Sequence, residues 1–273
     1  MCPNCRAFIT TSDRVCPYCD AQLGPRAIDV RLASLGGFLP RAYSTSIIIL
    51  TINFALYIAT AIVSFKAGQG GVMGIDANVL VDFGAKYGPY VAQGQWWRLI
   101  TAGFLHGSLI HILMNSWALF DLIAEVEGFY GTSRLIVAYV FTTFTGFFVS
   151  MLWRPAGLSV GASAACFGLI GIMLAIGLRR QDPMAQTVRA YYRRWAIYGL
   201  IFSILPGLNI DIGAHVGGLA GGFVLGLVAG LPGHPDSLRE RFWQGAAVVA
   251  VAVTLYAFFQ DFRFYQIVVQ QQP

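Results

Sequence analysis

The sequence predicts an all-α protein that crosses a membrane several times. Of its 273 residues, 56% are hydrophobic and only 11% are charged, and the mean hydropathy is +0.63. Soluble globular proteins carry about a quarter charged residues. Long charge-free segments recur along the chain, and none alternates with the period of two that a membrane β-barrel requires. We therefore expect a polytopic bundle of membrane-spanning helices.

Seven predominantly apolar segments are candidate spans, since a helix needs about 20 apolar residues to cross the hydrocarbon core. In chain order they are residues 46–65, 109–126, 135–153, 159–178, 195–208, 212–231 and 242–259. The fifth is short and contains Pro206, so it is the least regular of the set.

Arginines near the span ends predict the orientation, because cytoplasmic loops are enriched in basic residues. The connection between the fourth and fifth predicted spans carries one acid, Asp182, and the arginines Arg179, Arg180, Arg189, Arg193 and Arg194. The segment before the first span and the connection after the sixth are also basic, with Arg26, Arg31, Arg41, Arg239 and Arg241. We therefore expect the N-terminus in the cytoplasm and the C-terminus outside, with the first span acting as an uncleaved anchor.

The formal charge of the chain is +5, and its arginines gather near the span ends, where basic residues set the membrane orientation. The positive charge is thereby explained, so we expect no nucleic-acid partner. The spans suit an integral, multi-pass protein of the bacterial cytoplasmic membrane, and a eukaryotic secretory membrane fits them as well. We divide the chain into a cysteine-bearing module (1–22), a linker (23–44), a six-helix core (45–231) and a C-terminal part (232–273). That last part holds a cytoplasmic loop, the seventh span and the tail.

The N-terminal cysteines form two Cys-x-x-Cys pairs, Cys2 with Cys5 and Cys16 with Cys19. Two such knuckles can hold one zinc ion in a tetrahedron of thiolates. Iron in a rubredoxin-like site and a pair of disulfides are the alternatives, and the reducing cytosol disfavours disulfides. Four sulfur ligands leave no open position, so we expect structural Zn²⁺ in a zinc-ribbon-like cap, or a docking module for a cytosolic partner. Cys166, within a span, is expected to be a small core residue.

Polar side chains lie near the starts of the even-numbered spans, and ionisable groups inside a membrane are costly and usually functional. They are His106, His111 and Asn115 of the second span, Ser163 of the fourth and His215 of the sixth. In the expected orientation these spans all run inward, so the groups share one depth near the outer face. Each of these side chains, taken alone, is explained by packing between helices or by a hydrogen bond to the backbone of its own helix. Their coincidence favours a single site.

A serine hydroxyl becomes nucleophilic when a base removes its proton, and neutral histidine can be that base. We therefore expect Ser163 to attack a carbonyl with His215 as base and no cofactor for catalysis. The oxyanion needs donors, which the Asn115 amide, the His111 ring and the Ser163 backbone N–H can supply. Asp211 is expected to be too exposed to orient His215, which predicts a dyad. Zinc bound by histidines is the alternative, but no HExxH pair or acid accompanies them.

Small residues recur along the fourth and sixth predicted spans. The fourth has Gly161, Ala164, Gly168, Gly171 and Ala175, and the sixth has Ala214, Gly218, Gly222 and Gly226. Such stripes let membrane helices approach closely. We expect these spans to pack together and to bring Ser163 beside His215.

In combination and order, three motifs resemble those of the rhomboid intramembrane serine proteases: HILMN (111–115), GASAACFGLIG (161–171) and AHVGGLAGG (214–222). GQWWRLITAGFLH (94–106) resembles the end of that family's first loop, and VEGFYG (126–131) resembles its motif after the second span. The likeness covers about residues 45–260 and includes a seventh span after a six-helix core.

This resemblance implies that Ser163 is the nucleophile and His215 the general base, with His111, Asn115 and the Ser163 amide around the oxyanion. It implies a serine endopeptidase in the lipid bilayer that cleaves transmembrane helices of other membrane proteins near the outer face. Ala164 stands where the family often has glycine, and its methyl group is a candidate for narrowing substrate access. Further, an Arg98–Glu127 pair is hypothesised to brace the first loop against the second span.

Two other functions fit less well. An inactive rhomboid-like protein that binds or escorts membrane clients predicts loss of the serine or the histidine, and both are present. A channel or transporter predicts polar residues at the bilayer midplane, whereas here they gather at one end of the spans.

Overall fold

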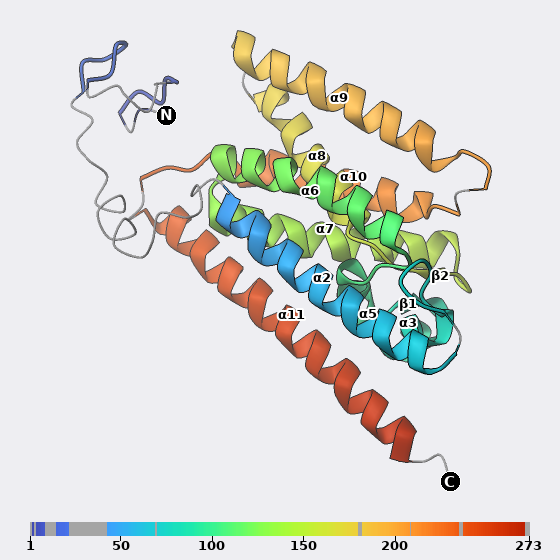
Figure 1. The fold of residues 1–273 in the computed structure, drawn as a ribbon. Helices are drawn as coiled ribbons and strands as arrows, with labels where there is room; N and C mark the ends of the chain where they lie inside the picture. The colour runs from blue at the N-terminus through green and yellow to red at the C-terminus, as the bar shows by residue number, and fades with distance from the viewer. Residues whose placement is uncertain are drawn as a thin grey trace.

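The computed structural model is a helical bundle that describes residues 2, 4–8, 15–21, 43–68, 70–179, 182–207, 209–234 and 237–270 (Figure 1). Most of the predicted linker lies outside these residues. Five helices are long and apolar enough to cross a membrane: α2 (Ser44–Lys66), α6 (Leu109–Tyr130), α7 (Thr132–Trp153), α10 (Ile212–Ala229) and α11 (Leu238–Gln270). Helix α8 (Ser163–Arg179) is apolar but shorter, and α9 (Pro183–Ser203) is amphipathic. The predicted all-α polytopic fold is confirmed.

Every predicted span falls on a helix, but the start predicted for the fourth is wrong. Helix α8 begins at Ser163 and not at residue 159. The residues before it form strand β2 (Leu158–Ser159), which pairs antiparallel with strand β1 (Lys86–Tyr87). Lys86 strengthens this junction, since its buried ammonium group donates to the carbonyl oxygens of Arg154 at 3.1 Å and Gly157 at 3.2 Å. This short sheet fixes the chain just before α8.

The bounds predicted for the fifth span are also wrong, because α9 starts earlier and ends at Ser203. Asp182 caps the helix, its carboxylate accepting a hydrogen bond from Ala185 N at 3.0 Å. Pro183 follows in the first turn, where a missing N–H costs no hydrogen bond. Arginines expected in a loop therefore lie on this helix instead: Arg189, Arg193 and Arg194. Their charge hid the first half of α9 from a search for apolar segments.

The segment between α2 and α6 is built of short elements. They are α3 (Ala77–Asp82), β1, α4 (Gly88–Ala92), α5 (Arg98–Thr101) and η3 (Ala102–Phe104). Arg98 lies in the interior of this segment, and its side chain is only 2% exposed. Its guanidinium donates to Gln95 Oε1 at 2.7 Å and to the carbonyl oxygens of Val81 at 2.5 Å and Ala85 at 3.1 Å. One buried side chain thus ties three parts of the segment together.

The hypothetical Arg98–Glu127 pair is wrong. Arg98 pairs with Asp261 of α11, at 3.8 Å. Glu127 instead accepts hydrogen bonds from the hydroxyls of Thr45 at 2.9 Å and Thr132 at 2.5 Å. The first loop is therefore braced against the seventh helix, and Glu127 joins α6 to the starts of α2 and α7.

Helices α8 and α10 pack backbone to backbone, which confirms the expectation from their small residues. A Cβ added to Gly218 would lie 2.1 Å from Ala164 O, and one added to Gly222 would lie 1.9 Å from Gly168 O. No side chain separates the two helices at these points. The Ala164 methyl group faces α7, where a Cβ on Gly146 would lie 2.7 Å from it. The idea that this methyl narrows the site is therefore wrong.

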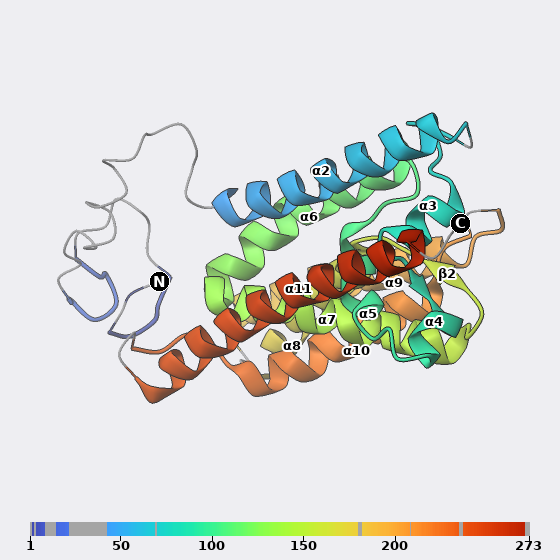
Figure 2. The same cartoon turned by 90° about the horizontal axis from the view of Figure 1, so that it is seen from below.

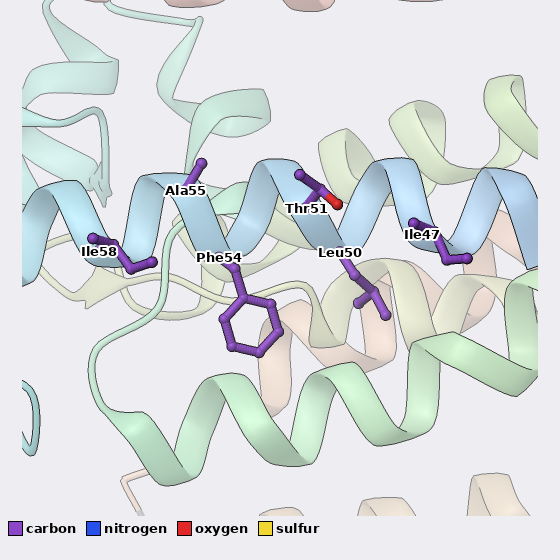
Figure 3. Close-up of a pocket in the computed structure, with 6 residues that line it drawn as sticks. All are labelled: Ile47, Leu50, Thr51, Phe54, Ala55 and Ile58. Carbon is purple, nitrogen blue, oxygen red and sulfur yellow. The ribbon is translucent and has the colours of Figure 1, made fainter. Parts of the chain in front are cut away.

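Helices α9 and α11 lie on opposite flanks of the bundle, and α2 lies beside α6 (Figures 1 and 2). A shallow hollow on α2 is lined by Ile47, Leu50, Thr51, Phe54, Ala55 and Ile58 (Figure 3). These side chains are apolar apart from one hydroxyl and include no titratable group. The hollow therefore suits an acyl chain or an apolar helix and not chemistry.

Candidate active site

Ser163 occupies the first position of α8, where the helix presents free backbone N–H groups. The first bond within the helix runs from Cys166 N to Ala162 O, at 3.0 Å. The N–H groups of Ser163, Ala164 and Ala165 precede that bond, so the partial positive charge of the helix end surrounds the serine. Gly161 makes the turn into the helix with φ +129, a conformation that L side chains rarely adopt.

His111 and Asn115 lie against this turn although they are distant in sequence. A Cβ added to Gly161 would lie 2.6 Å from His111 Nε2 and 3.4 Å from Asn115 Nδ2. Ser108 caps α6 by accepting from His111 N at 3.2 Å, which sets the start of the helix that carries both residues. Asn115 Nδ2 is buried and has no partner among the described residues. An orphan donor here is available to an incoming oxygen.

His215 approaches α8 from α10 and is 6% exposed. Its ring stacks on Phe167, with centroids 4.2 Å apart and planes inclined by 20°. Phe167 lies one turn after Ser163 on the same face of α8. The stack therefore brings the imidazole to the serine's side of the helix. In the described part of the chain no hydrogen bond joins Ser163 to His215, and such bonds often tighten only when substrate is bound.

Ser203, the last residue of α9, is a contact of His215 that the sequence did not reveal. Its hydroxyl lies 2.6 Å from His215 Nδ1. Nothing in the sequence around it distinguishes it from other serines of the spans. Phe167 was missed for the same reason, since an aromatic residue in an apolar helix carries no signal of its own.

The Asp211 carboxylate makes no hydrogen bond to the His215 ring among the described residues, although it is half-buried and not exposed as expected. Its carboxylate caps α10, accepting from Ala214 N at 3.1 Å, and it also accepts a hydrogen bond from the Ser150 hydroxyl. Its hydrogen bond to His215 is the helical one, in which the His215 backbone N–H donates to Asp211 O at 3.2 Å. The carboxylate is thus engaged in holding α10 to α7.

His106 lies behind His111, with ring centroids 5.2 Å apart at 70°. It is 1% exposed, and neither ring nitrogen has a partner among the described residues. His106 is therefore a neighbour of the site, packed beneath the imidazole of His111. Within the described ranges, the four N-terminal cysteines are the one group of His, Cys or acidic side chains close enough to hold a metal.

Those cysteines converge from two similar knuckles, with all four sulfur atoms within 4.8 Å of one another. Cys2 O accepts from Arg6 N and Cys16 O accepts from Asp20 N, each at 2.9 Å. The closest sulfur pairs are 3.6 Å apart, far beyond the length of a disulfide. Hydrogen bonds, the strongest from the Cys5 backbone N–H, lower the pKa of the Cys2 thiol to about 6, whereas the net effect of its surroundings raises the pKa of the Cys5 thiol to about 12. The four thiols therefore share their protons as one coupled group. The group fits a four-thiolate metal site.

Comparisons with known proteins point to one family. The model of the Rhomboid domain matches residues 93–231. The chain is 33% identical over 198 residues to Rhomboid protease GluP of Bacillus subtilis, covering 72% of this chain and 38% of that protein. It is 31% identical over 219 residues to Rhomboid-like protease 2 of Toxoplasma gondii, covering 78% and 74%. Putative rhomboid protease YdcA of Bacillus subtilis is 33% identical over 139 residues, covering 50% and 68%. The chain thus spans well under two thirds of GluP, but most of the other two.

Proposed function

Because this chain belongs to the rhomboid family, we propose that it is an intramembrane serine endopeptidase with Ser163 as nucleophile and His215 as base. Its relatives include proteins named as rhomboid proteases, and the bundle is that of an integral, multi-pass membrane protein. One observation carries the assignment of the dyad. The His215 ring stacks on Phe167, one turn after Ser163, near the N-terminus of α8. The buried amide nitrogen of Asn115, which has no hydrogen-bond partner among the described residues, lies beside that helix end.

The proposed reaction begins when the Ser163 Oγ–H gives its proton to His215 Nε2 and Oγ attacks the scissile carbonyl carbon. The carbonyl π electrons move to oxygen, and the oxyanion accepts hydrogen bonds from Asn115 Nδ2, His111 Nε2 and Ser163 N–H. His215 then protonates the leaving amine as the C–N bond breaks, which leaves an acyl ester on Ser163. Water attacks that ester with His215 again as base, releasing the acid and restoring the serine.

The proposed substrates are transmembrane segments of other membrane proteins. A helical backbone has its polar groups satisfied, so the segment must unwind locally before a peptide bond can meet Ser163. The polar residues gather at one end of the helices, and the arginine distribution supports placing that end at the outer face. Cleavage is accordingly proposed near the outer face, with the N-terminus in the cytoplasm of a bacterial cell.

The test is proteolysis of a generic single-span substrate in liposomes by the wild type and by Ser163→Ala and His215→Ala. We expect cleavage by the wild type alone. Equal cleavage by all three proteins would remove the proposal, since a contaminating protease would then explain it. No cleavage by a folded wild type, together with an unreactive Ser163, would favour the escort function instead.

For the N-terminal module (1–22) we propose a structural zinc ribbon facing the cytoplasm, with Cys2, Cys5, Cys16 and Cys19 as ligands. Zinc held by four thiolates has no open coordination position, so no catalytic step involves it. Elemental analysis of the purified full chain should give one zinc per protein and none in a variant with Cys5→Ser and Cys16→Ser. Bound iron, or equal zinc in both proteins, would contradict this assignment.

A further inference from the structure

We propose that Ser203 is a positioning residue that holds the neutral His215 ring with its proton on Nδ1, which leaves Nε2 free as the base. The inference rests on the proposed function, because it concerns the atom that would accept the Ser163 proton. It adds a third helix, α9, to a site otherwise built from α6, α8 and α10.

The hydrogen-bond inventory of Ser203 fixes the direction of each bond. Its hydroxyl is buried and contacts two groups, Gly199 O and His215 Nδ1, each at 2.6 Å. A serine hydroxyl has one hydrogen to donate and two lone pairs that accept. A carbonyl oxygen only accepts, so two oxygens at this distance repel unless the hydroxyl hydrogen lies between them. The Ser203 proton therefore goes to Gly199 O, and Ser203 Oγ accepts from His215 Nδ1–H.

The tautomer of His215 follows from that direction. A neutral imidazole carries one N–H, so a proton on Nδ1 leaves the Nε2 lone pair available. When Nε2 takes the proton of Ser163, Nδ1–H still donates to Ser203, so the same contact stabilises the imidazolium. Stacking on Phe167 fixes the plane of the ring, and the bond to Ser203 fixes its rotation within that plane.

Helix α9 is brought to this position by a glycine. A Cβ added to Gly199 would lie 2.7 Å from Phe167 Cζ, so only glycine lets α9 pass this close to the ring. Ser203 lies one turn further along and contacts His215, the histidine that stacks on the same Phe167 ring. Gly199, Ser203 and Phe167 thus form one unit around His215.

Ser203 takes the place that a carboxylate holds in a catalytic triad. Asp211 is occupied by Ala214 N and Ser150, and within the described residues Ser203 is the sole hydrogen-bond partner of the His215 ring. A neutral hydroxyl stabilises the imidazolium less than a carboxylate does. The expected effect of Ser203→Ala is therefore modest, about a tenfold fall in kcat with KM unchanged.

The experiment combines nitrogen-15 NMR of isotope-labelled histidine in bilayers with kinetics on the same preparations. The chain has only 4 histidines, and His215→Ala assigns the relevant signal. The wild type should show protonated Nδ1 and unprotonated Nε2, and Ser203→Ala should show a mixture of tautomers and the tenfold lower kcat. Thr187→Ala is the matched control, because the Thr187 hydroxyl donates to Pro183 O of the same helix and does not contact His215.

Protonated Nε2 in the wild type would overturn the inference even if Ser203→Ala failed to fold. An unchanged spectrum and kcat in a folded Ser203→Ala protein would overturn it too. Failure of the proposed function is distinguishable, since Ser163→Ala would then be as active as the wild type whatever the tautomer. If Ser163→Ala is inactive and Ser203→Ala is fully active, only the role of Ser203 is lost.

Discussion

Helices α10 and α11 both flank the core, yet they are attached to it in different ways. Helix α10 meets α8 along its length, with glycines that leave no room for a methyl group. Helix α11 is held by polar contacts near its start, where Glu240 bonds to Arg134, and further along, where Asp261 lies near Arg98 and Trp97. Between them Ala257 packs on the core, but many of the other side chains are exposed. The backbone contact between α8 and α10 sets the distance between the helices that carry Ser163 and His215. The polar contacts of α11 set only the position of α11 on the bundle.

This difference between α10 and α11 predicts that substitutions in the two helices affect different properties, the stability of the fold and the reactivity of Ser163. Changes at the polar contacts of α11 should lower the free energy of unfolding and leave the chemistry of the folded protein alone. Changes on the α8 face of α10 should alter the reactivity of Ser163 even where the loss of stability is smaller.

The largest expected effect on stability is that of Arg134→Ala. Arg134 donates two bonds of 2.7 Å to the Glu240 carboxylate, and its guanidinium lies 5.2 Å from the centre of the Trp243 ring. Removing one partner leaves a buried charge, so we expect a loss of about 3–5 kcal/mol in the free energy of unfolding. Denaturation in detergent measures it, with kcat at a permissive temperature unchanged.

The control for this pair is the double change Arg134→Met with Glu240→Met. Replacing both charges with apolar side chains should recover most of the lost stability, because no unpaired charge remains. A double variant as unstable as Arg134→Ala would show that side-chain packing, and not charge, holds the start of α11.

Gly222→Ala should lower the free energy of unfolding less than Arg134→Ala does, but should lower the activity more. The added Cβ would meet Gly168 O, a backbone atom that cannot rotate away, so α8 and α10 must separate. We expect a loss of about 1–3 kcal/mol in unfolding free energy, with a slower reaction of Ser163 in the folded protein. Gly245→Ala on α11 is the matched control, since an added Cβ there meets nothing within 4 Å. Equal effects of the two substitutions would contradict the difference between α10 and α11.

Among the contacts that join two segments, the smallest effect is expected for Asp261→Asn. The amide keeps an oxygen for Trp97 Nε1, which now donates to Asp261 Oδ1 at 3.2 Å, and loses only the charge 3.8 Å from Arg98. Arg98 retains its bonds to Gln95 and two carbonyl oxygens. A loss of about 1 kcal/mol in the free energy of unfolding is therefore expected. Thr254→Ala, which removes a bond within α11 alone, should change less still.

The sequence predicted those parts of the fold that depend on apolarity and small residues. The helices and the close approach of α8 to α10 follow from charge-free segments and from glycines at every fourth position. The start of α9 did not follow, because its arginines lie on a helix that apolarity alone cannot find. The start of α8 was missed because a two-residue strand such as β2 has no periodicity to detect.

The candidate site divides in the same way. Ser163, His215, His111 and Asn115 stood out because each is polar where the neighbouring residues are apolar. Ser203 and Phe167 did not, because a serine and a phenylalanine are ordinary in a membrane helix. Their roles arise from contacts between helices that are distant in sequence, and so do the partners of Arg98 and Asp261.

The central claim is that His215 activates Ser163, and covalent labelling tests it most directly. The folded protein in liposomes would be treated with a fluorophosphonate, and the adduct would be mapped by mass spectrometry. We predict a single adduct on Ser163 that forms at least about 100-fold more slowly in His215→Ala, the usual contribution of a general base. Labelling at another serine, or at the same rate without His215, would contradict the account.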